Sequence, residues 1–410
     1  MNRRKFLQYA SLLTAAGLTP IGLQGWAARG MASTTTNKRL IVIFLRGGID
    51  GLNVVVPFQD QDYYEARPRI AIPQPKEKGG VLDLDGHFGL HPALADLMPL
   101  WKQGSLAFVH ACGSPDTTRS HFDAQNYMES GTPGDKTTSD GWMNRLLATL
   151  PEAGPTQAVN IGSMISPILM GNSSVASLPP GSNATRSLSV DRSQLNAAFE
   201  RLYRGNDPIH LAYQEGQQAR EILLATLAAE MREADNGAPP PNGFAKDTRN
   251  LARLMVGDSQ TQLAFMALGG WDTHINQGSS QGQFANKLKS LAQGLVTLVQ
   301  ELGSVYSDTA IAILSEFGRT VKENGNGGTD HGHGNVMWIL GGGIRGGKVY
   351  GEWSGLSESA LFQGRDLAVT TDFREAIASI LEQHIRLKAN QVAQVFPDFT
   401  SNHRLQSAWK

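Results

Sequence analysis

Short uninterrupted apolar runs recur along the chain, separated by polar and glycine-rich segments. Five of them consist mainly of Val, Ile, Leu and Ala, and we predict that they form strands: residues 40–45, 105–111, 261–268, 309–314 and 335–340. A strand without alternating polar positions is typical of a sheet covered on both faces. The hydrophobic pattern therefore predicts a layered α/β fold.

Between these runs, apolar residues return every three or four positions, as on one face of a helix. We predict helices over residues 91–101, 120–129, 281–302 and 373–384, with Ser120 and Asp372 as N-caps. Because strands alternate with helices, the fold class we expect is α/β, with a central, largely parallel sheet and helices on both faces.

The pattern changes between about residues 151 and 258. Short Ser-, Gly- and Pro-rich pieces come first, and polar helical stretches follow over residues 194–204, 209–235 and 244–256, with a proline-rich break at residues 237–243. We predict that this region is a helical insertion or cap on the sheet.

The N-terminus has the pattern of a twin-arginine export signal. Arg3 and Arg4 precede a mildly apolar segment without acidic residues, which is too polar for a stable membrane span. We predict cleavage after Ala32, with Ala28 as the alternative, and so a signal peptide over residues 1–32 and an α/β domain over residues 33–410. The expected partner is the twin-arginine export machinery, and the expected location is periplasmic or secreted.

Composition narrows the function further. The chain has 36 basic and 37 acidic residues, and loss of residues 1–32 would leave 32 basic residues, a net charge of about −5. This balance argues against nucleic-acid binding and against capture by an anionic membrane. No other apolar stretch is long enough to span a bilayer. The single cysteine, Cys112, cannot form an internal disulfide.

Carboxylates and imidazoles gather in short segments beside the predicted strands. The candidate metal ligands are Asp50, Asp272, His274, Glu316, Asp330, His331 and His333. Ligands of open α/β sheets collect at the carboxyl ends of strands, and Asp and His bind Zn²⁺ and similar cations. We expect a divalent metal site, with Zn²⁺ first and Mn²⁺, Mg²⁺ or Ca²⁺ as alternatives. The competing interpretation is a set of Gly-rich turns held by Asx-type hydrogen bonds.

Five segments in this order resemble the signature blocks of an exported bacterial family, domain of unknown function 1501: residues 46–53, 119–123, 269–274, 315–320 and 328–332. The resemblance covers nearly the whole chain after the signal. It implies the fold of the alkaline phosphatase and sulfatase superfamily, and hence a two-metal hydrolase of phosphate or sulfate esters, acting on a small anionic ester or a polymer.

The resemblance also assigns roles. Asp50 matches the Asp after the first strand, and Ser120 matches the nucleophile at a helix start, with Thr118 as the alternative. On local chemistry alone, Ser120 is an N-cap first. Asp272 and His274 match the metal-binding pair before the long helix, although the superfamily spaces that pair further apart.

The remaining ligands admit two registers. Either Asp330 and His331 match the superfamily's Asp-His pair after a strand, or residues 311–316 are that strand, with Glu316 in place of the Asp and His331 or His333 as the late His. We prefer the second register, because the glycine-rich residues 324–328 cannot form a strand. It leaves Phe317 where the superfamily has a ligand His, which favours an alternative function as a catalytically inactive envelope scaffold or binding protein.

Other residues near the motifs have two interpretations each. Arg119 and Arg319 are candidate anion clamps, because a guanidinium binds phosphate or sulfate bidentately, or they form surface ion pairs. His121 either reaches the site or packs. Cys112 is not expected to become a sulfatase-type nucleophile, because Pro115 and Arg119 are displaced from the spacing of that motif.

Overall fold

The computed structural model describes residues 38–151, 154, 156–162, 164–180 and 234–410. The predicted signal peptide and the predicted helix over residues 194–204, with nearly all of that over 209–235, lie outside these residues. The described residues belong to one compact unit, which begins at Asn37 and ends at Lys410.

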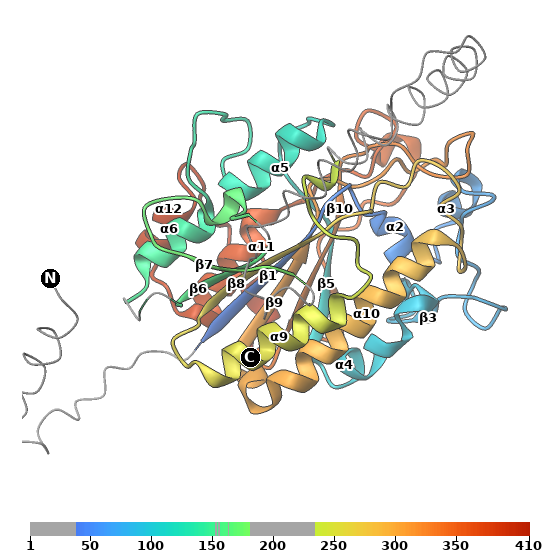
Figure 1. The fold of residues 1–410 in the computed structure, drawn as a ribbon. Helices are drawn as coiled ribbons and strands as arrows, with labels where there is room; N and C mark the ends of the chain where they lie inside the picture. The colour runs from blue at the N-terminus through green and yellow to red at the C-terminus, as the bar shows by residue number, and fades with distance from the viewer. Residues whose placement is uncertain (1–37, 152–153, 155, 163, 181–233) are drawn as a thin grey trace, which may run out of the picture. The chain divides into compact units, whose positions relative to one another are not determined.

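A nine-stranded sheet forms the centre of this unit (Figure 1). Its order is β11-β5-β10-β9-β1-β8-β6-β7, and β12 also pairs with β5. The strands are β1 (Arg39–Leu45), β5 (Leu106–Gly113), β6 (Ala158–Ile161), β7 (Ala176–Leu178), β8 (Leu263–Leu268), β9 (Thr309–Leu314), β10 (Asn335–Gly341), β11 (Val349–Tyr350) and β12 (Thr371–Asp372).

The sheet is largely parallel, as predicted. β1 pairs in parallel with β8 and β9, whereas β10 runs antiparallel to both β9 and β5. The loop that enters β10 therefore lies at the same edge as the loops that leave β1, β5, β8 and β9. We call this edge the carboxyl rim.

Helices cover both faces of the sheet, as predicted (Figure 1). In β1, Ile41, Ile43 and Leu45 enter one core and Leu40, Val42 and Phe44 the other, because successive side chains of a strand point to opposite faces. The first core includes α4 (Met98–Lys102), α9 (Phe244–Gly257), α10 (Gln283–Leu302) and the 3₁₀ helix η1 (Pro92–Leu97). The second includes α6 (Trp142–Thr149), α11 (Phe373–Ile380) and α12 (Ala389–Val395).

Small elements complete the described fold. A three-stranded sheet contains β2 (Val55–Val56), β3 (Leu82–Asp83) and β4 (Gly89–Leu90), and short helical segments include α2 (Gly51–Val54), α3 (Gln61–Ala66), η2 (Pro167–Leu169), η4 (Gly303–Asp308) and η6 (Leu381–Ile385). Among the described helices, none is both long and apolar enough to cross a bilayer.

Two predictions at the element level differ from the structure. The predicted helix over 91–101 is η1 followed by α4, because Pro92 and Pro99 each lack an N–H and start a new helical turn. The segment predicted as a helical insertion contributes β6 and β7 to the central sheet, where β6 pairs with β8. β6 and β7 are only four and three residues long, so their sequences carry little periodic signal.

Candidate metal centre

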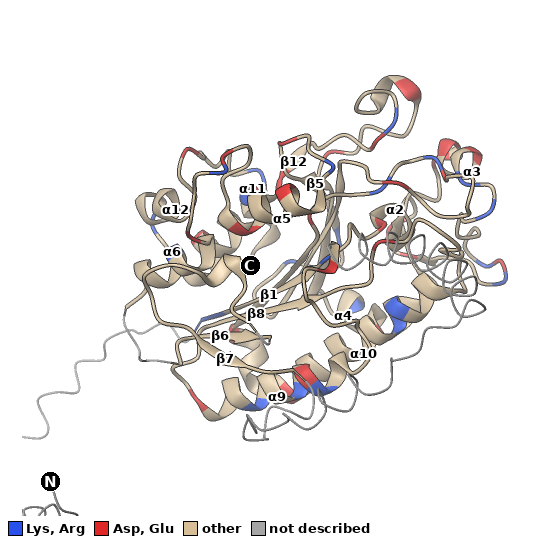
Figure 2. Cartoon of the chain, turned by 45° about the horizontal axis from the view of Figure 1, so that its top comes forward, with Lys and Arg blue, Asp and Glu red and all other residues tan. Residues whose placement is uncertain are grey.

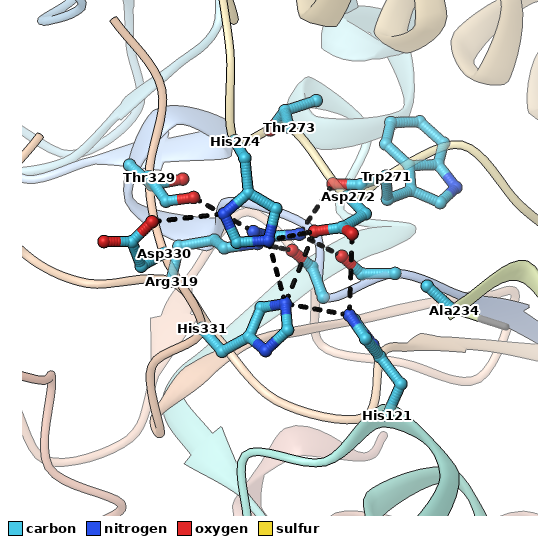
Figure 3. A network of polar contacts seen from close by, with 12 residues as sticks. His121, Ala234, Trp271, Asp272, Thr273, His274, Arg319, Thr329, Asp330 and His331 are labelled. Atoms are coloured by element: carbon cyan, nitrogen blue, oxygen red, sulfur yellow. Dashed lines mark hydrogen bonds and ion pairs between the residues drawn. The ribbon is translucent and has the colours of Figure 1, made fainter. Parts of the chain in front are cut away.

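Four side chains from three rim loops converge on one point (Figure 3). We call His121, Asp272, His274 and His331 the histidine cluster. His121 is the first residue of α5 (His121–Ser130), Asp272 and His274 follow β8, and His331 lies between β9 and β10. The predicted convergence of distant acid and imidazole segments is thus present, with His121 as a full member.

The distances within the cluster are short. Nε2 of His331 lies 2.9 Å from Nε2 of His121 and 3.0 Å from Nε2 of His274. Asp272 Oδ1 lies 2.9 Å from Nε2 of His274, and Asp272 Oδ2 lies 3.8 Å from Nε2 of His121. Ligand atoms around a tetrahedral Zn²⁺, bonded at about 2.0–2.1 Å, are roughly 3.3 Å apart. These distances lie near that spacing, and a single cation of that size fits best between His121, Asp272 and His331, whose ligand atoms all lie within 4.8 Å of one another.

The opposite ring nitrogens point to acceptors outside the cluster. Nδ1 of His121 donates to Glu316 Oε1 at 2.8 Å, Nδ1 of His274 to Asp330 Oδ1 at 3.1 Å, and Nδ1 of His331 to the carbonyl of Arg119 at 2.9 Å. A neutral imidazole that donates through Nδ1 presents a lone pair on Nε2, as in metal-binding histidines.

Asp272, like the imidazoles, is arranged to bind a cation. Its Oδ2 is buried and has no hydrogen-bond partner among the described residues. Burial alone would raise the pKa of Asp272, but hydrogen bonds from His274 and His331 and the charge of Arg319 lower it well below its usual range. A buried, ionised carboxylate with an unpaired oxygen fits a cation ligand.

The pKa values of two of these imidazoles shift in opposite directions. The hydrogen bond to Asp272 raises the pKa of His274, whereas burial lowers the pKa of His331 despite the same carboxylate. In the described residues, His121, Asp272 and His331 form the group that fits a cation by its spacing alone, with their ligand atoms within 4.8 Å of one another.

Two predicted ligands support the cluster instead of joining it. Burial alone would raise the pKa of Glu316, but the hydrogen bond and charge of His121 lower it. Glu316 also accepts the backbone N–H of Gly47 at 2.7 Å, so its role is to orient His121. Asp330, which is exposed, orients His274 in the same way. Glu316 lies two residues after the end of β9.

Asp50 and His333 lie outside the histidine cluster, contrary to the predicted ligand set. Asp50 is fully buried and forms an ion pair of 2.7 Å with Arg67, and it accepts from Gln277 Nε2 at 2.6 Å. His333 packs against Phe362, with 4.5 Å between ring centroids and the ring planes tilted by 35°. Arg67 directly follows α3, and no local pattern in the sequence pairs it with Asp50.

Arg319 holds loops of the carboxyl rim together and is not arranged to bind an anion. Its guanidinium is fully buried and donates to the carbonyls of Gly47, Gly48, Trp271 and Thr329 and to Asp272 Oδ1 at 2.6 Å. These contacts join the loops after β1 and β8 to the loop before β10. Because its N–H groups already donate to these acceptors, Arg319 cannot bind a substrate without losing the contacts that hold the rim loops together.

The predicted catalytic residues surround the start of α5. Ser120 is exposed, and its Oγ accepts the N–H of Asp123 at 3.4 Å, which confirms the predicted N-cap. Thr118 Oγ1 accepts the N–H of Ser120. Arg119 binds Asp366 at 2.6 Å, so the ion-pair interpretation holds, although its side chain stays 29% exposed. Cys112 is buried, and burial raises the pKa of its thiol.

Residues next to the cluster are apolar as well as charged. Phe317 packs against His121 and His331 at ring centroid distances of 4.8 and 5.0 Å. Phe122 is 79% exposed directly after His121. Arg365 donates to the carbonyl of His331 at 2.5 Å and remains exposed. An anion at the cluster would therefore lie beside an exposed guanidinium and an aromatic surface.

The solved structures to which this chain is similar have low identity to it. Ps i-CgsB in complex with k-i-k-neocarrahexaose is 10% identical, with a TM-score of 0.43, 86% of this chain covered and 73% of that one. A protein in the alkaline phosphatase superfamily from Vibrio parahaemolyticus is 13% identical (TM-score 0.36; 76% and 62% covered). The lipoteichoic acid synthase LtaP from Listeria monocytogenes is 9% identical (TM-score 0.37; 82% and 75% covered).

No protein with a curated function matches the sequence. A family model does match, over residues 37–396, which is most of the chain and contains every member of the histidine cluster. The chain belongs to the family described as "Protein of unknown function (DUF1501)".

Proposed function

We propose that the chain is an exported, metal-dependent hydrolase that binds one divalent cation, Zn²⁺ first among the candidates, through the histidine cluster and acts on phosphate or sulfate esters. One observation carries the metal centre. All three Nδ1 atoms have outward acceptors, so each Nε2 is directed toward the other members of the cluster, and Nε2 of His331 lies 2.9 Å from that of His121 and 3.0 Å from that of His274. Unprotonated Nε2 atoms this close would repel one another through their lone pairs, and a shared cation removes that repulsion.

A cation held there would supply Lewis-acid polarisation of an ester oxygen. The chain's own residues bind and orient the substrate. Ser120, at the N-terminus of α5, offers a hydroxyl next to the ligand His121, where the helix end favours an anion. Its hydrogen bond from Asp123 is long, so an Oγ lone pair remains available to form a bond to phosphorus or sulfur while the ester's P–O or S–O bond breaks. The alcohol leaves with the hydroxyl proton, and water then hydrolyses the serine ester. Arg365 and the exposed part of Arg119 orient the oxygens, with Thr118 supporting Ser120.

The structure favours one cation over the predicted two. In the superfamily pattern Asp50 would hold the second ion, but the Arg67 guanidinium already neutralises its carboxylate in a fully buried pair. A cation at Asp50 would have to displace Arg67 and leave it buried without a counter-charge, which costs several kcal/mol. We therefore infer that Asp50 stabilises the fold through its ion pair with Arg67 and does not bind a metal ion.

Metal content tests this centre without any assay of activity. Mature protein purified without chelators should contain about one ion per chain, and cobalt-loaded protein should show the absorption of a four-coordinate ion. Asp272→Ala and His331→Ala should lose both, whereas His403→Ala, at an exposed histidine, and Asp50→Asn should keep them. Equal, negligible metal in the wild type and Asp272→Ala would reject the centre.

Activity is tested separately with aryl phosphates, a phosphodiester and aryl sulfates, each with Zn²⁺, Mn²⁺, Mg²⁺ or Ca²⁺. Turnover that needs the ion and is abolished in Ser120→Ala supports the hydrolase. The second candidate function, an inactive envelope scaffold, is favoured by Phe317 beside His121 and His331 and by the neutralised Asp50. It predicts metal binding without turnover on any of these esters.

Export is proposed from the N-terminal pattern alone. Replacement of Arg3 and Arg4 by lysines should retain full-length protein in the cytoplasm, whereas the unaltered chain should appear in the periplasm or medium, shortened after Ala32. Periplasmic accumulation of the double-lysine variant at the wild-type level would contradict the twin-arginine route.

A further inference from the structure

A buried glutamine side chain joins the two loops that carry three of the four members of the histidine cluster. Gln277 lies between β8 and α10 and is fully buried. Its Oε1 accepts from Oγ1 of Thr273 at 2.7 Å and from Oγ1 of Thr329 at 3.2 Å. Thr273 stands between the two cluster residues of the loop after β8, and Thr329 stands two residues before the cluster residue of the loop before β10 (Figure 3). One amide oxygen therefore connects the two loops.

The ion pair of Asp50 and Arg67 fixes the direction of this amide. Nε2 of Gln277 donates to Asp50 Oδ2 at 2.6 Å. A carboxylate only accepts hydrogen bonds, so the amide nitrogen has to face Asp50 and the amide oxygen has to face the two threonines. Nη1 of Arg67 lies 3.0 and 2.7 Å from the two carboxylate oxygens, which holds Asp50 in place. The ion pair thus decides which end of the amide the loops receive.

The two threonine hydroxyls have little access to water. Thr273 and Thr329 are 1% and 0% exposed. Between the same residues, the backbone N–H of Thr329 donates to the carbonyl of Thr273 at 3.2 Å, and the N–H of Gln277 donates to the carbonyl of Gly327 at 2.9 Å. A hydroxyl that lost the amide oxygen would be a buried donor without its acceptor, which is unfavourable. We therefore expect at least one of the loops to shift when the amide is removed.

We propose that Gln277 is a positioning residue of the metal centre. It does not belong to the ligand set, and it acts through the two threonines on the cluster residues beside them. A metal site requires its ligands to be held within about 0.5 Å of the productive geometry, so a small displacement of either loop lowers affinity. The inference rests on the proposed metal centre and extends it, because it gives the buried pair of Asp50 and Arg67 a part in metal affinity without contact to the ion.

Gln277→Met tests the role, because it keeps the approximate length and volume of the side chain and removes both amide groups. In the full mature chain, Zn²⁺ affinity measured by chelator competition should fall at least tenfold. The absorption spectrum of bound Co²⁺ should also change, because the ligand geometry changes. Asp50→Asn retains an oxygen that can accept from Nε2, so its ion should remain bound.

Gln157→Met is the matched control. Gln157 is 4% exposed, and its Nε2 donates to Gln262 Oε1 and to the carbonyl of Pro151, both at 2.8 Å. It directly precedes β6 at the amino ends of β6 and β8, the opposite edge of the sheet from the cluster. Gln157→Met should lose stability in denaturant unfolding, as Gln277→Met does, but should keep the Zn²⁺ affinity and the Co²⁺ spectrum. An equal loss of Zn²⁺ affinity in both variants would overturn the inference.

A double-mutant cycle tests the path through the threonines. Thr273→Val and Thr329→Val remove the hydroxyl donors at nearly constant shape, and each should lower Zn²⁺ affinity. Gln277→Met added to the pair of valines should lower it by less than a further twofold, because the same hydrogen bonds are already absent. A further loss as large as that of Gln277→Met alone would overturn the proposed path.

Hydrogen exchange of the metal-free chain separates this inference from the metal centre itself. The N–H groups of Asn276, Gln277 and Thr329 donate between the loops, and the three amides at these positions should exchange at least tenfold faster in Gln277→Met but not in Gln157→Met. Faster exchange in a chain that binds no metal would keep the link between the loops and reject the centre. Wild-type exchange in a chain that binds metal would reject the link and keep the centre.

Discussion

Three hydrogen bonds made by Nδ1 atoms decide how the imidazoles of this site can be used. Glu316, Asp330 and the Arg119 carbonyl each accept one, which turns Nε2 of His121, His274 and His331 toward a common point. Metal-binding histidines usually have such acceptors, which fix the tautomer and the ring orientation. The acceptors are therefore expected to contribute to metal affinity without contacting the ion.

Glu316→Gln should lower metal affinity roughly 10–100-fold, because an amide oxygen is a weaker acceptor for His121 than a carboxylate. Asp330→Asn should have a smaller effect, since Asp330 is exposed. Chelator competition measures both, with the exposed Glu358→Gln as a control. Unchanged affinity in Glu316→Gln would show that His121 is oriented by packing alone.

Ser120 combines a cap with the proposed nucleophile, and two substitutions separate the roles. Ser120→Ala should lower the free energy of unfolding by about 1 kcal/mol and abolish turnover. Ser120→Asp should keep the cap, and hence the stability, but still lack turnover. Denaturant unfolding and the ester assay report the two effects. Turnover that survives in Ser120→Ala would shift the nucleophile to Thr118 or exclude a serine mechanism.

Among the elements, the rim loops are held together by backbone contacts that leave no room for side chains. Gly318 donates to the carbonyl of His333 and accepts from the N–H of Gly332, so it fixes the loop that carries His331. A Cβ at Gly318 would overlap the Gly334 carbonyl. The loop before β10 therefore depends on a glycine after β9.

Gly318→Ala should cost about 1–3 kcal/mol of stability and should weaken metal binding at the same time, because the displaced loop carries His331. Gly325→Ala, in the same connection but with open space around a built Cβ, should change neither by more than about 0.5 kcal/mol. Thermal unfolding and chelator competition provide the readouts. An unaffected metal affinity in a destabilised Gly318→Ala protein would separate the loop from the site.

The central strands β1 and β9 can be predicted from the hydrophobic pattern, whereas the short strand β6 cannot. The runs over 40–45 and 309–314 became β1 and β9 because a continuous apolar run has few alternatives to a buried strand. The hydrophobic pattern does not predict the pairing of β6 with β8, because register is set by partners about a hundred residues away and not by the four residues of β6.

In the whole unit, the Arg46–Glu129 pair links the sheet to α5 inside the core. Both side chains are almost completely buried. Burial raises the pKa of Glu129 from 4.5 to about 7. The folded state therefore binds the proton more tightly than the unfolded state does, and stability falls as the pH rises from about 4.5 to 7.

Glu129→Gln removes this titration. The wild type should lose stability relative to the variant between pH 4.5 and 7, by roughly 3 kcal/mol at most, while the two curves should converge below pH 4.5. Denaturant unfolding at each pH measures the difference, and Glu358→Gln serves as the control. A difference that stays constant over this pH range would mean that Glu129 remains ionised throughout.

The distribution of charge over the unit is mixed. Basic and acidic residues both occur over the described elements (Figure 2), and α9 itself carries three basic residues, Lys246, Arg249 and Arg253, and one acidic residue, Asp247. Arg249 and Arg253 both lie near Glu301 of the neighbouring α10. Exposed pairs of this kind contribute little stability, so the fold depends on its two cores.

At this scale, the amino-acid sequence alone was enough to specify the main strands, the layers and the edge of the sheet at which acids and imidazoles gather. Burial and spacing are local properties, and they appear directly in the hydrophobic pattern of the chain. Which polar groups meet became known only from the folded chain. His121 and Glu316 form a hydrogen bond although they are 195 positions apart in the sequence. Asp50 pairs with Arg67 and not with a metal ion. The direction in which a buried polar side chain makes its bonds depends on partners brought by the path of the chain, and no local pattern encodes that direction.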